Sequence, residues 1–222
     1  ETIVVTLSHP TNAALSAQTT HTYTIKDDDL IHDRFVSISS GNDANDGKSW
    51  SNAMKTIQAA VNDIENGYTV WVSNGVYETG GVAGYPNPAD ALTNRIAIHK
   101  PITVQSMNGP GSTIIRGVGS IGDAAVRCVY LTNGASLVGF TLTNGATRAA
   151  GDAAREQNGG GLWCDSTNAA VSNCVITGNS ANRNGGGAHW GQLYGCRMIG
   201  NMAGEYGGGA VYGTLRNCEV IG

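Results

Sequence analysis

The sequence is poor in charged residues, in proline and in long apolar runs. Charged side chains make up 14% of its 222 residues, well below the usual ~25%. Only five residues are proline and no Gly-X-Y period is present, which excludes a collagen-like rod. The longest apolar run, 124–131, falls short of the ~18–20 residues of a membrane span and is interrupted by Arg127. A net charge of −4 without a basic stripe argues against nucleic acid as a partner.

Glycine, in contrast, is abundant, with 32 residues, about twice its usual share of ~7%. Apolar residues reach 41%, which excludes a disordered chain, because disorder goes with few apolar residues and much charge. A folded protein with many tight turns remains. The sequence opens without a methionine or a signal peptide and stops at Gly222 inside a repeating pattern, so we expect a segment of a longer protein.

A repeat of 22 residues is the strongest structural signal in the sequence. Three cysteines recur at this interval in matching contexts, at Cys174, Cys196 and Cys218. Glycine triplets and Gly-Asn pairs accompany them, at 159–161, 185–187, 207–209, 178–179 and 200–201. A weaker upstream copy has Phe140 in the cysteine position, and an insertion at 146–158 separates it from the next copy. Periods of about 20–50 residues indicate a solenoid.

The repeat unit indicates which solenoid this is. Each repeat contains two or three short runs of β-branched or apolar residues, separated by Gly and Asn, and no helical stretch. This pattern lacks the leucine spacing of leucine-rich repeats and the paired helices of tetratricopeptide or ankyrin repeats. It predicts an all-β parallel β-helix, in which each coil hydrogen-bonds to the next ~4.8 Å along the axis.

Stacked coils place equivalent residues directly above one another. We therefore expect the three repeat cysteines to form an internal ladder of small apolar side chains. Stacked neighbours suit a disulfide poorly, and the CxxC pairs or histidine partners of a metal site are missing. Asn179 and Asn201 are expected to form a second ladder at a turn. Cys128 and Cys164 lie in neighbouring coils outside the cysteine ladder, and a disulfide between them stays an open alternative.

One helix-like pattern precedes the coils. The segment 52–65 has apolar residues every three or four positions, at Met54, Ile57, Val61 and Ile64. Ser51 can cap its start, and Asn66-Gly67 can end it. The first coil is expected to begin with a strand at 68–77. Because an open solenoid end exposes its core and unpaired strand edges, we interpret this amphipathic helix as an N-terminal cap.

Residues 34–50, which include the run Gly-Asn-Asp-Ala-Asn-Asp-Gly-Lys-Ser-Trp, resemble the start of bacterial right-handed parallel β-helix proteins of the pectate-lyase-like superfold. The segments 56–61, 71–77 and 127–145 and the Gly-Gly-Gly…Asn-Cys…Gly-Asn repeats add to this resemblance. Within the superfold, the chain is similar to large surface proteins that carry a C-terminal sorting anchor, the choice-of-anchor group. The resemblance implies an extracellular or cell-surface location. It implies no activity, because lyases, hydrolases and adhesins share this superfold.

Residues 1–29 carry a second resemblance. The segments 1–7, 10–13 and 20–29 look like the last hairpin of a Calx-β domain, a calcium-associated immunoglobulin-like sandwich. In that family, acidic residues after the last strand help to bind calcium, which implies a calcium site at Asp27, Asp28 and Asp29. The alternative is a solvated linker between domains.

We therefore expect three parts in the chain. Residues 1–30 form the terminal hairpin of a truncated Calx-β-like domain and a linker. Residues 31–67 form an entry strand and the capping helix. Residues 68–222 form β-helix coils that continue beyond the end of the chain.

The insertion supplies the only dense group of charged side chains with catalytic potential. Its candidates are Arg148, Asp152, Arg155 and Glu156, with Arg127 and Asp165 expected nearby. A lyase needs a base such as Arg or Lys and a group that neutralises the uronate carboxylate, whereas a hydrolase needs paired carboxylates. The alternative is a solvated loop with surface ion pairs, like the weak pair expected between Arg197 and Glu219.

Aromatic side chains gather next to the glycine triplets, at Trp163, His189, Trp190, Tyr206 and Tyr212. Exposed rings on a solenoid face can stack on sugar rings, which makes Trp163, His189, Trp190 and Tyr212 candidates for glycan binding. Alternation along the strands predicts that part of this set lies in the core instead.

Together these features favour an extracellular structural or adhesive β-helix module over an enzyme. The alternative is a polysaccharide lyase or glycoside hydrolase that uses the insertion or coils beyond this segment. A third hypothesis is self-assembly, in which the N-terminal hairpin pairs with the open edge of a neighbouring subunit. The expected partners are surface glycans or copies of the chain itself, without nucleic acid and without a membrane span in this segment.

Overall fold

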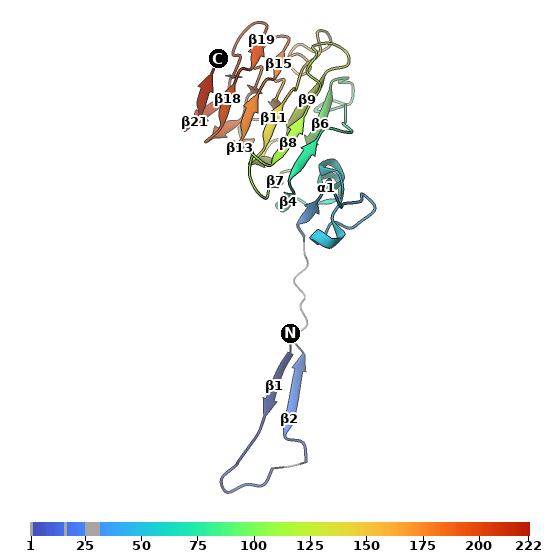
Figure 1. Ribbon diagram of the computed structural model, residues 1–222, viewed down its shortest axis with the longest axis vertical. Coiled ribbons are helices and arrows are strands. Elements are labelled where there is room, and N and C mark those ends of the chain that lie inside the picture. The colour runs from blue at the N-terminus through green and yellow to red at the C-terminus, as the bar shows by residue number, and fades with distance from the viewer. Residues whose placement is uncertain (1, 16, 25–31) are drawn as a thin grey trace. The chain divides into compact units, whose positions relative to one another are not determined.

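The computed structural model describes residues 2–15, 17–24 and 32–222 and divides the chain into two compact units, Glu1–Ile31 and His32–Gly222 (Figure 1). In the first unit, β1 (Thr2–Thr6) pairs antiparallel with β2 (Thr20–Thr24), in a register that joins Thr6 to Thr20. The expected hairpin is present. Its resemblance to a Calx-β domain stays a prediction, and Asp27, Asp28 and Asp29 lie outside the described residues.

The second unit contains three parallel sheets that the chain visits in turn. The first sheet consists of β3 (Arg34–Val36), β4 (Thr69–Val72), β7 (Thr103–Ser106), β10 (Ser136–Val138), β13 (Ala170–Ser172), β17 (Gln192–Tyr194) and β21 (Thr214–Arg216). The second sheet consists of β5 (Gly75–Tyr77), β8 (Thr113–Arg116), β11 (Thr141–Thr143), β14 (Val175–Thr177), β18 (Arg197–Ile199) and β22 (Glu219–Ile221). The third sheet consists of β6 (Thr93–Ile98), β9 (Val126–Leu131), β12 (Leu162–Cys164), β16 (Ala188–His189) and β20 (Ala210–Val211).

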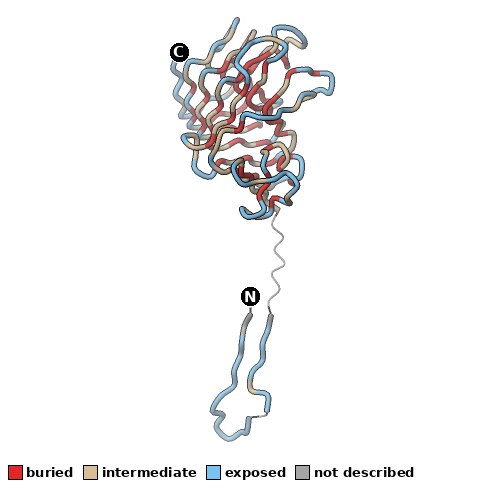
Figure 2. Tube along the Cα trace, turned by 45° about the vertical axis from the view of Figure 1, so that its right-hand side comes forward, coloured by how far each residue is buried: buried red, intermediate tan, exposed pale blue. Residues whose placement is uncertain are grey.

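Each coil contributes one strand to each sheet, and strands in consecutive coils pair in parallel. In the first sheet, Val104, Leu137, Val171 and Leu193 occupy one register position and are fully buried. Figure 2 shows buried positions recurring along the inner side of every coil, and a short pair, β15 (Ser180–Ala181) with β19 (Met202–Ala203), joins the last coils. The predicted right-handed parallel β-helix is confirmed. The strand expected at 68–77 is divided into β4 and β5, because the chain turns between them at Ser73 and Asn74.

The cysteine ladder occupies the turn between the first and second sheets. Register pairing brings Phe140, Cys174, Cys196 and Cys218 to equivalent positions, and the Phe140 N–H donates to the Cys174 Sγ at 3.4 Å. The preceding residue is left-handed in every coil, with φ of 78°, 52°, 59° and 51° at Gly139, Asn173, Gly195 and Asn217. Only Gly and Asn occupy this position, because they adopt left-handed backbone at low cost.

All five cysteines are free. Burial raises the pKa of Cys128 and of Cys164 to about 12, so both stay protonated at neutral pH. The disulfide left open between them is therefore absent from this structure.

The asparagine ladder joins the coils at the next turn. The Asn179 Nδ2 donates to the Asn201 Oδ1 at 3.0 Å and to the Leu142 carbonyl at 3.0 Å, while the Asn179 Oδ1 accepts from the Gly145 N–H at 2.8 Å. Asn179 is 1% exposed, so these bonds satisfy an amide that is shielded from water.

The glycine triplets lie where neighbouring turns approach most closely. A Cβ atom on the middle glycine of the second triplet, Gly186, would lie 2.1 Å from the Met202 carbonyl oxygen of the next coil. The same position in the first triplet, Gly160, faces the Ser180 carbonyl oxygen at 2.2 Å. No side chain fits at these positions, which explains the repetition of glycine there.

The helical segment differs from the expectation in its start. A 3-10 turn, η1 (Trp50–Asn52), is capped by Ser49, and helix α1 (Ile57–Asp63) is capped by Thr56, whose hydroxyl accepts from the Ala59 N–H. The prediction of a cap at Ser51 was wrong. The carboxylate of Asp43 accepts from the backbone N–H groups of Lys55 and Thr56 at 2.8 Å, so the chain between the two turns is held outside the helix.

Helix α1 lies against β6, the outermost strand of the third sheet. The Gln58 side chain accepts from the Ala97 N–H at 2.8 Å and donates to the Ala97 carbonyl at 3.3 Å, as a neighbouring strand would. Ile57, Ala60, Val61 and Ile64 are buried in the core of the coils. Both contacts fit a cap, although the capping role stays a prediction.

Candidate functional site

A row of aromatic side chains follows the outer face of the third sheet. Strand pairing aligns Tyr130 with Trp163 and Trp163 with His189, while the alternate residues Val129, Leu162 and Ala188 point into the core. The ring centroids of Tyr130 and Trp163 are 5.8 Å apart, and those of Trp163 and His189 are 6.1 Å apart with an interplanar angle of 1°. We call Tyr130, Trp163 and His189 the aromatic row.

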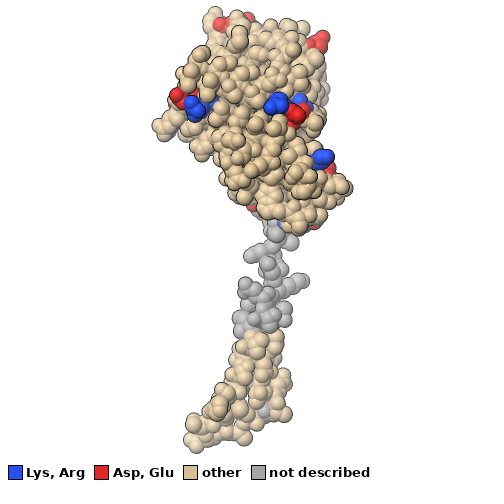
Figure 3. All heavy atoms as spheres, viewed as in Figure 1, with Lys and Arg blue, Asp and Glu red and all other residues tan. Residues whose placement is uncertain are grey.

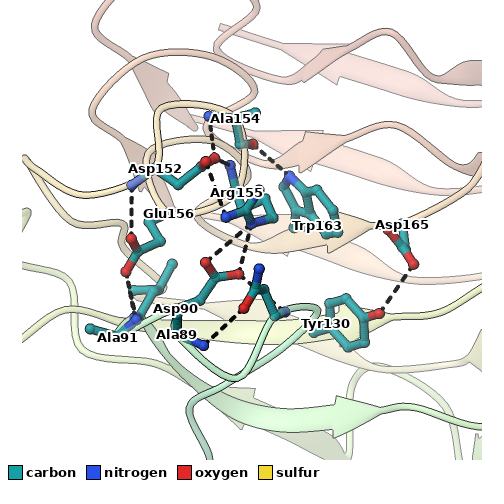
Figure 4. A network of polar contacts seen from close by, with 12 residues as sticks. Ala89, Asp90, Ala91, Tyr130, Asp152, Ala154, Arg155, Glu156, Trp163 and Asp165 are labelled. Atoms are coloured by element: carbon teal, nitrogen blue, oxygen red, sulfur yellow. Dashed lines mark hydrogen bonds and ion pairs between the residues drawn. The ribbon is translucent and has the colours of Figure 1, made fainter.

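Two loops cover this row. Trp163 and His189 are only 4% and 5% exposed. The Trp163 Nε1 donates to the Ala154 carbonyl of the insertion at 3.0 Å, and the ring of Tyr85 lies 5.6 Å from that of Tyr130 (Figure 4). These side chains are thus buried beneath loops on the outside of the sheet. The expectation that part of the aromatic set lies in the core is corrected in this respect, because alternation directs Trp163 and His189 outward.

The exposed aromatic side chains come next along the chain. Trp190 and Tyr212 hold equivalent positions in successive coils, one residue after His189 and Val211, and are 37% and 69% exposed. Both have left-handed backbone, with φ of 62° and 55°. Such backbone is uncommon for aromatic residues and is kept only where the surroundings enforce it.

The buried row supports the exposed rings. The centroid of Trp190 lies 5.4 Å from His189 and 6.2 Å from Trp163, and Tyr212 meets His189 edge-on at 5.8 Å. Tyr206, 70% exposed, lies near the third glycine triplet. The four predicted residues therefore contact one another through His189. Sequence reasoning missed Tyr130 and Tyr85, although the strand register of Tyr130 relative to Trp163 was a signal that could have found the former.

His189 is an unusual member of the row. Its Nδ1 is buried and has no hydrogen-bond partner. Burial, together with the charge of Arg127, lowers the pKa of His189 to about 4. The ring is therefore neutral at physiological pH and packs as an aromatic side chain.

The insertion is held against a loop of an earlier coil by ion pairs. The Arg155 Nε donates to the two carboxylate oxygens of Asp90 at 2.9 and 3.1 Å, and Asp90 is 4% exposed (Figure 4). The Arg148 guanidinium donates to Asp123 at 2.7 Å and to Glu156 at 2.9 Å. The charges of the insertion thus join three segments of the chain.

Glu156 lies at the centre of these contacts. Its carboxylate accepts from the N–H groups of Ala91 at 2.7 Å, Leu92 at 2.9 Å and Asp152 at 2.8 Å. Burial acts to raise the pKa of Glu156, but the hydrogen bonds, including that from Arg148, outweigh it and keep the pKa below its usual value. An ionised, fully bonded carboxylate of this kind is poorly suited to donate a proton as a general acid.

Arg127 lies beneath the insertion and is fully buried. Its guanidinium donates to the carbonyls of Gly159 and Asn158 at 2.8 and 2.9 Å, to the Asn94 Oδ1 at 3.0 Å and to the Arg155 carbonyl. Burial lowers its pKa to about 9. The expectation that Arg127 lies near the insertion holds in the structure.

Asp165, the other residue expected beside the insertion, lies apart from these ion pairs. It accepts a hydrogen bond of 3.4 Å from the Tyr130 hydroxyl instead (Figure 4). The four candidate catalytic residues, Arg148, Asp152, Arg155 and Glu156, are brought together, but in contacts that hold the loop.

Charged side chains are sparse elsewhere on the coils. On the face drawn in Figure 3, they are few and lie mostly as neighbours of opposite sign. The strands of the first sheet carry no carboxylate on either face, and within 2–15, 17–24 and 32–222 no group of three or more His, Cys, Asp or Glu residues is placed to hold a metal ion. None of the helices described is long and apolar enough to cross a membrane.

Comparison with known proteins identifies the fold and goes no further. No protein-family model matches the chain, and no curated protein is significantly similar to it. Among solved structures, a pectin methylesterase from carrot superposes with a TM-score of 0.52 at 18% identity over 84% of this chain and 51% of its own. A rhamnogalacturonan lyase matches with a TM-score of 0.48 at 14% identity over 85% of this chain and 51% of its own. The chain thus spans about half the length of the structures that it resembles.

Proposed function

We propose that this chain is a structural and adhesive β-helix module of an extracellular or cell-surface protein, and that it binds carbohydrate at Trp190 and Tyr212. The observation that carries the proposal is the repetition of an exposed aromatic side chain at one position of two successive coils. Rings held in this way offer apolar faces on which the C–H face of a sugar stacks.

The buried aromatic row supports this proposal through rigidity. Trp190 rests on Trp163 and His189, so little side-chain freedom is left to lose when a sugar binds. The low charge of the coils favours neutral sugars over strongly acidic ones. The extracellular location rests on the resemblance to surface proteins and is part of the proposal.

The test is to screen the protein against immobilised glycans and then to titrate the best ligand. Asn suits both positions, because it tolerates left-handed backbone, so Trp190→Asn and Tyr212→Asn remove the rings with little change to the turn. We expect the double variant to lose at least about tenfold in affinity, and Trp50→Ala, which removes an exposed ring elsewhere, to bind like the parent. Equal binding by the double variant and the parent would contradict the proposal.

The enzymatic alternative, a polysaccharide lyase or glycoside hydrolase, depends on Arg148, Asp152, Arg155 and Glu156. Their mutual ion pairs support a holding role instead. Depolymerisation assays on neutral and acidic polysaccharides distinguish the two. Activity that falls with Asp152→Asn while the melting temperature stays unchanged would favour the enzyme.

Self-assembly through the N-terminal hairpin remains part of the proposal. Val4, Val5, Leu7 and Tyr23 are between 46% and 61% exposed, and β1 and β2 pair only with each other among the described strands. Mass measurement by light scattering with and without residues 1–31 tests this, since an unchanged oligomeric state would exclude it. The calcium site at Asp27, Asp28 and Asp29 likewise stays a prediction, for which calcium titration of the same two proteins is the test.

A further inference from the structure

A pocket of about 220 Å³ lies at the N-terminal end of the coils, away from the exposed aromatic side chains. Its walls come from α1, from the segment that follows β5, and from β6. Pockets for drug-sized ligands measure ~300–1,000 Å³, so this one suits a smaller molecule.

Most of the pocket wall is apolar. Ile38, Ile57, Val82 and Ile96 line it together with the ring of Tyr77. Ile57 and Ile96 are 2% exposed and belong to the core, which makes this wall rigid. A compact apolar group would therefore replace water here at little cost in protein reorganisation.

Both charged side chains that line the pocket are cationic. Arg95 is 8% exposed, and its Nε and Nη1 donate to the carbonyls of Arg116 and Gly80, which leaves Nη2 without a partner among the described residues. The Lys55 ammonium makes no hydrogen bond or ion pair with the described residues, although its backbone N–H is bound by Asp43. A desolvated guanidinium and a free ammonium together favour an anion.

No acidic side chain lines the pocket to compete for these cations. Glu78 is the nearest rival, because its charge acts on Arg95, but its carboxylate is paired with Arg116 at 2.7 Å. Burial lowers the pKa of Arg95, which is consistent with a cation that lacks a full anionic partner.

From this combination of a closed apolar wall with two unopposed cations, we propose that the pocket binds a small organic carboxylate with a compact apolar body. The carboxylate lies between Lys55 and Arg95, and the apolar body packs on Ile57 and Ile96. This site is independent of carbohydrate binding, because it shares no residue with the aromatic side chains at Trp190 and Tyr212.

Benzoate is the probe for the test, and benzamide, which has the same shape without the charge, is its matched control. Titration followed by amide NMR or calorimetry should give a dissociation constant of about 1 mM for benzoate, as suits a ligand of roughly nine non-hydrogen atoms. Benzamide should bind at least about tenfold more weakly. Shifts should centre on Ile57, Ile96 and the 79–82 segment.

Two lysine variants localise the charge. Lys55→Met should weaken benzoate about threefold to tenfold and leave benzamide unchanged, whereas Lys48→Met, at an exposed lysine outside the pocket, should change neither. Thr79→Phe, at an exposed position on the pocket rim, should weaken both probes by narrowing the pocket.

Three outcomes would overturn the proposal. One is the absence of saturable benzoate binding at about tenfold above the expected constant. Another is equal affinity for benzoate and benzamide. The third is an equal effect of Lys48→Met and Lys55→Met, which would indicate attraction to the overall charge of the protein and no defined site.

Discussion

The second and third sheets are built from the same coils but differ in what covers them. The outer positions of the second sheet carry short or exposed side chains, such as Thr141, Thr177 and Arg197. On the third sheet, two loops cover Tyr130, Trp163 and a fully buried Arg127. The comparison shows that the repeat defines the scaffold, whereas departures from it, the insertion and the loop at 80–92, create the chemically distinct surface.

The largest effect that separates the two sheets is expected at Arg127. Arg127→Met keeps much of the volume but leaves the carbonyls of Gly159 and Asn158 and the Asn94 amide without their donor. We expect a loss of about 3–5 kcal/mol in the free energy of unfolding, measured by urea denaturation. A loss below about 1 kcal/mol would show that the cover of the third sheet does not depend on this side chain.

The next effect concerns pH. The pKa of His189 is lowered to about 4 in the folded chain, against about 6.5 in the unfolded one, so the unfolded state binds the additional proton. Stability is therefore lost as the pH falls from about 6.5 to about 4, by about 2–3 kcal/mol from this residue. His189→Phe keeps the stacked ring and should flatten this part of the pH profile of stability. An identical profile in both proteins would contradict the assignment.

A smaller effect is expected where coils are joined without any covering loop. Asn179→Ala removes the acceptor of the Gly145 N–H and the donor to the Leu142 carbonyl inside the core. We expect a loss of about 2 kcal/mol in thermal or urea unfolding. Asn201→Ala, at a less buried position of the same ladder, should cost less, and the reverse order would argue against the ladder as the source of stability.

The smallest effect is expected on the outer face of the second sheet. Arg197 pairs with Glu219 across two coils, and the two side chains are 54% and 53% exposed. Solvent screens such a pair, so Arg197→Ala should change the free energy of unfolding by no more than about 0.5 kcal/mol. A change as large as that of Arg127→Met would remove the contrast between the two sheets.

The parts of the fold that follow from repetition were predictable from the sequence. The spacing of Cys174, Cys196 and Cys218 located the ladder, and the Gly-Asn pairs located Asn179 and Asn201, because stacking turns sequence period into contact. The predicted helix start failed at Ser51. There, a tertiary contact from Asp43 outweighs the local capping signal, and nothing in the neighbouring sequence indicates it.

The candidate site was predictable only in part. Trp190 and Tyr212 were found because they follow strands in equivalent repeats. Asp90, which binds Arg155, could not be found, because it lies in a loop 65 residues earlier that has no counterpart in other coils. Contacts between two irregular loops leave no periodic trace in a sequence.

The two Gly-Asn corners at 178–179 and 200–201 give the molecule a unit of length. Removing residues 179–200 would join Gly178 to Asn201 and restore the same dipeptide at the same corner, with Cys174 facing Cys218 in place of Cys196. The left-handed glycine is preserved in the joined chain, since Gly178 and Gly200 have φ of 61° and 57°. Gain or loss of 22 residues is thus a step that this architecture accommodates, and the reach of the rod can change in whole coils while the register of the remaining strands is kept.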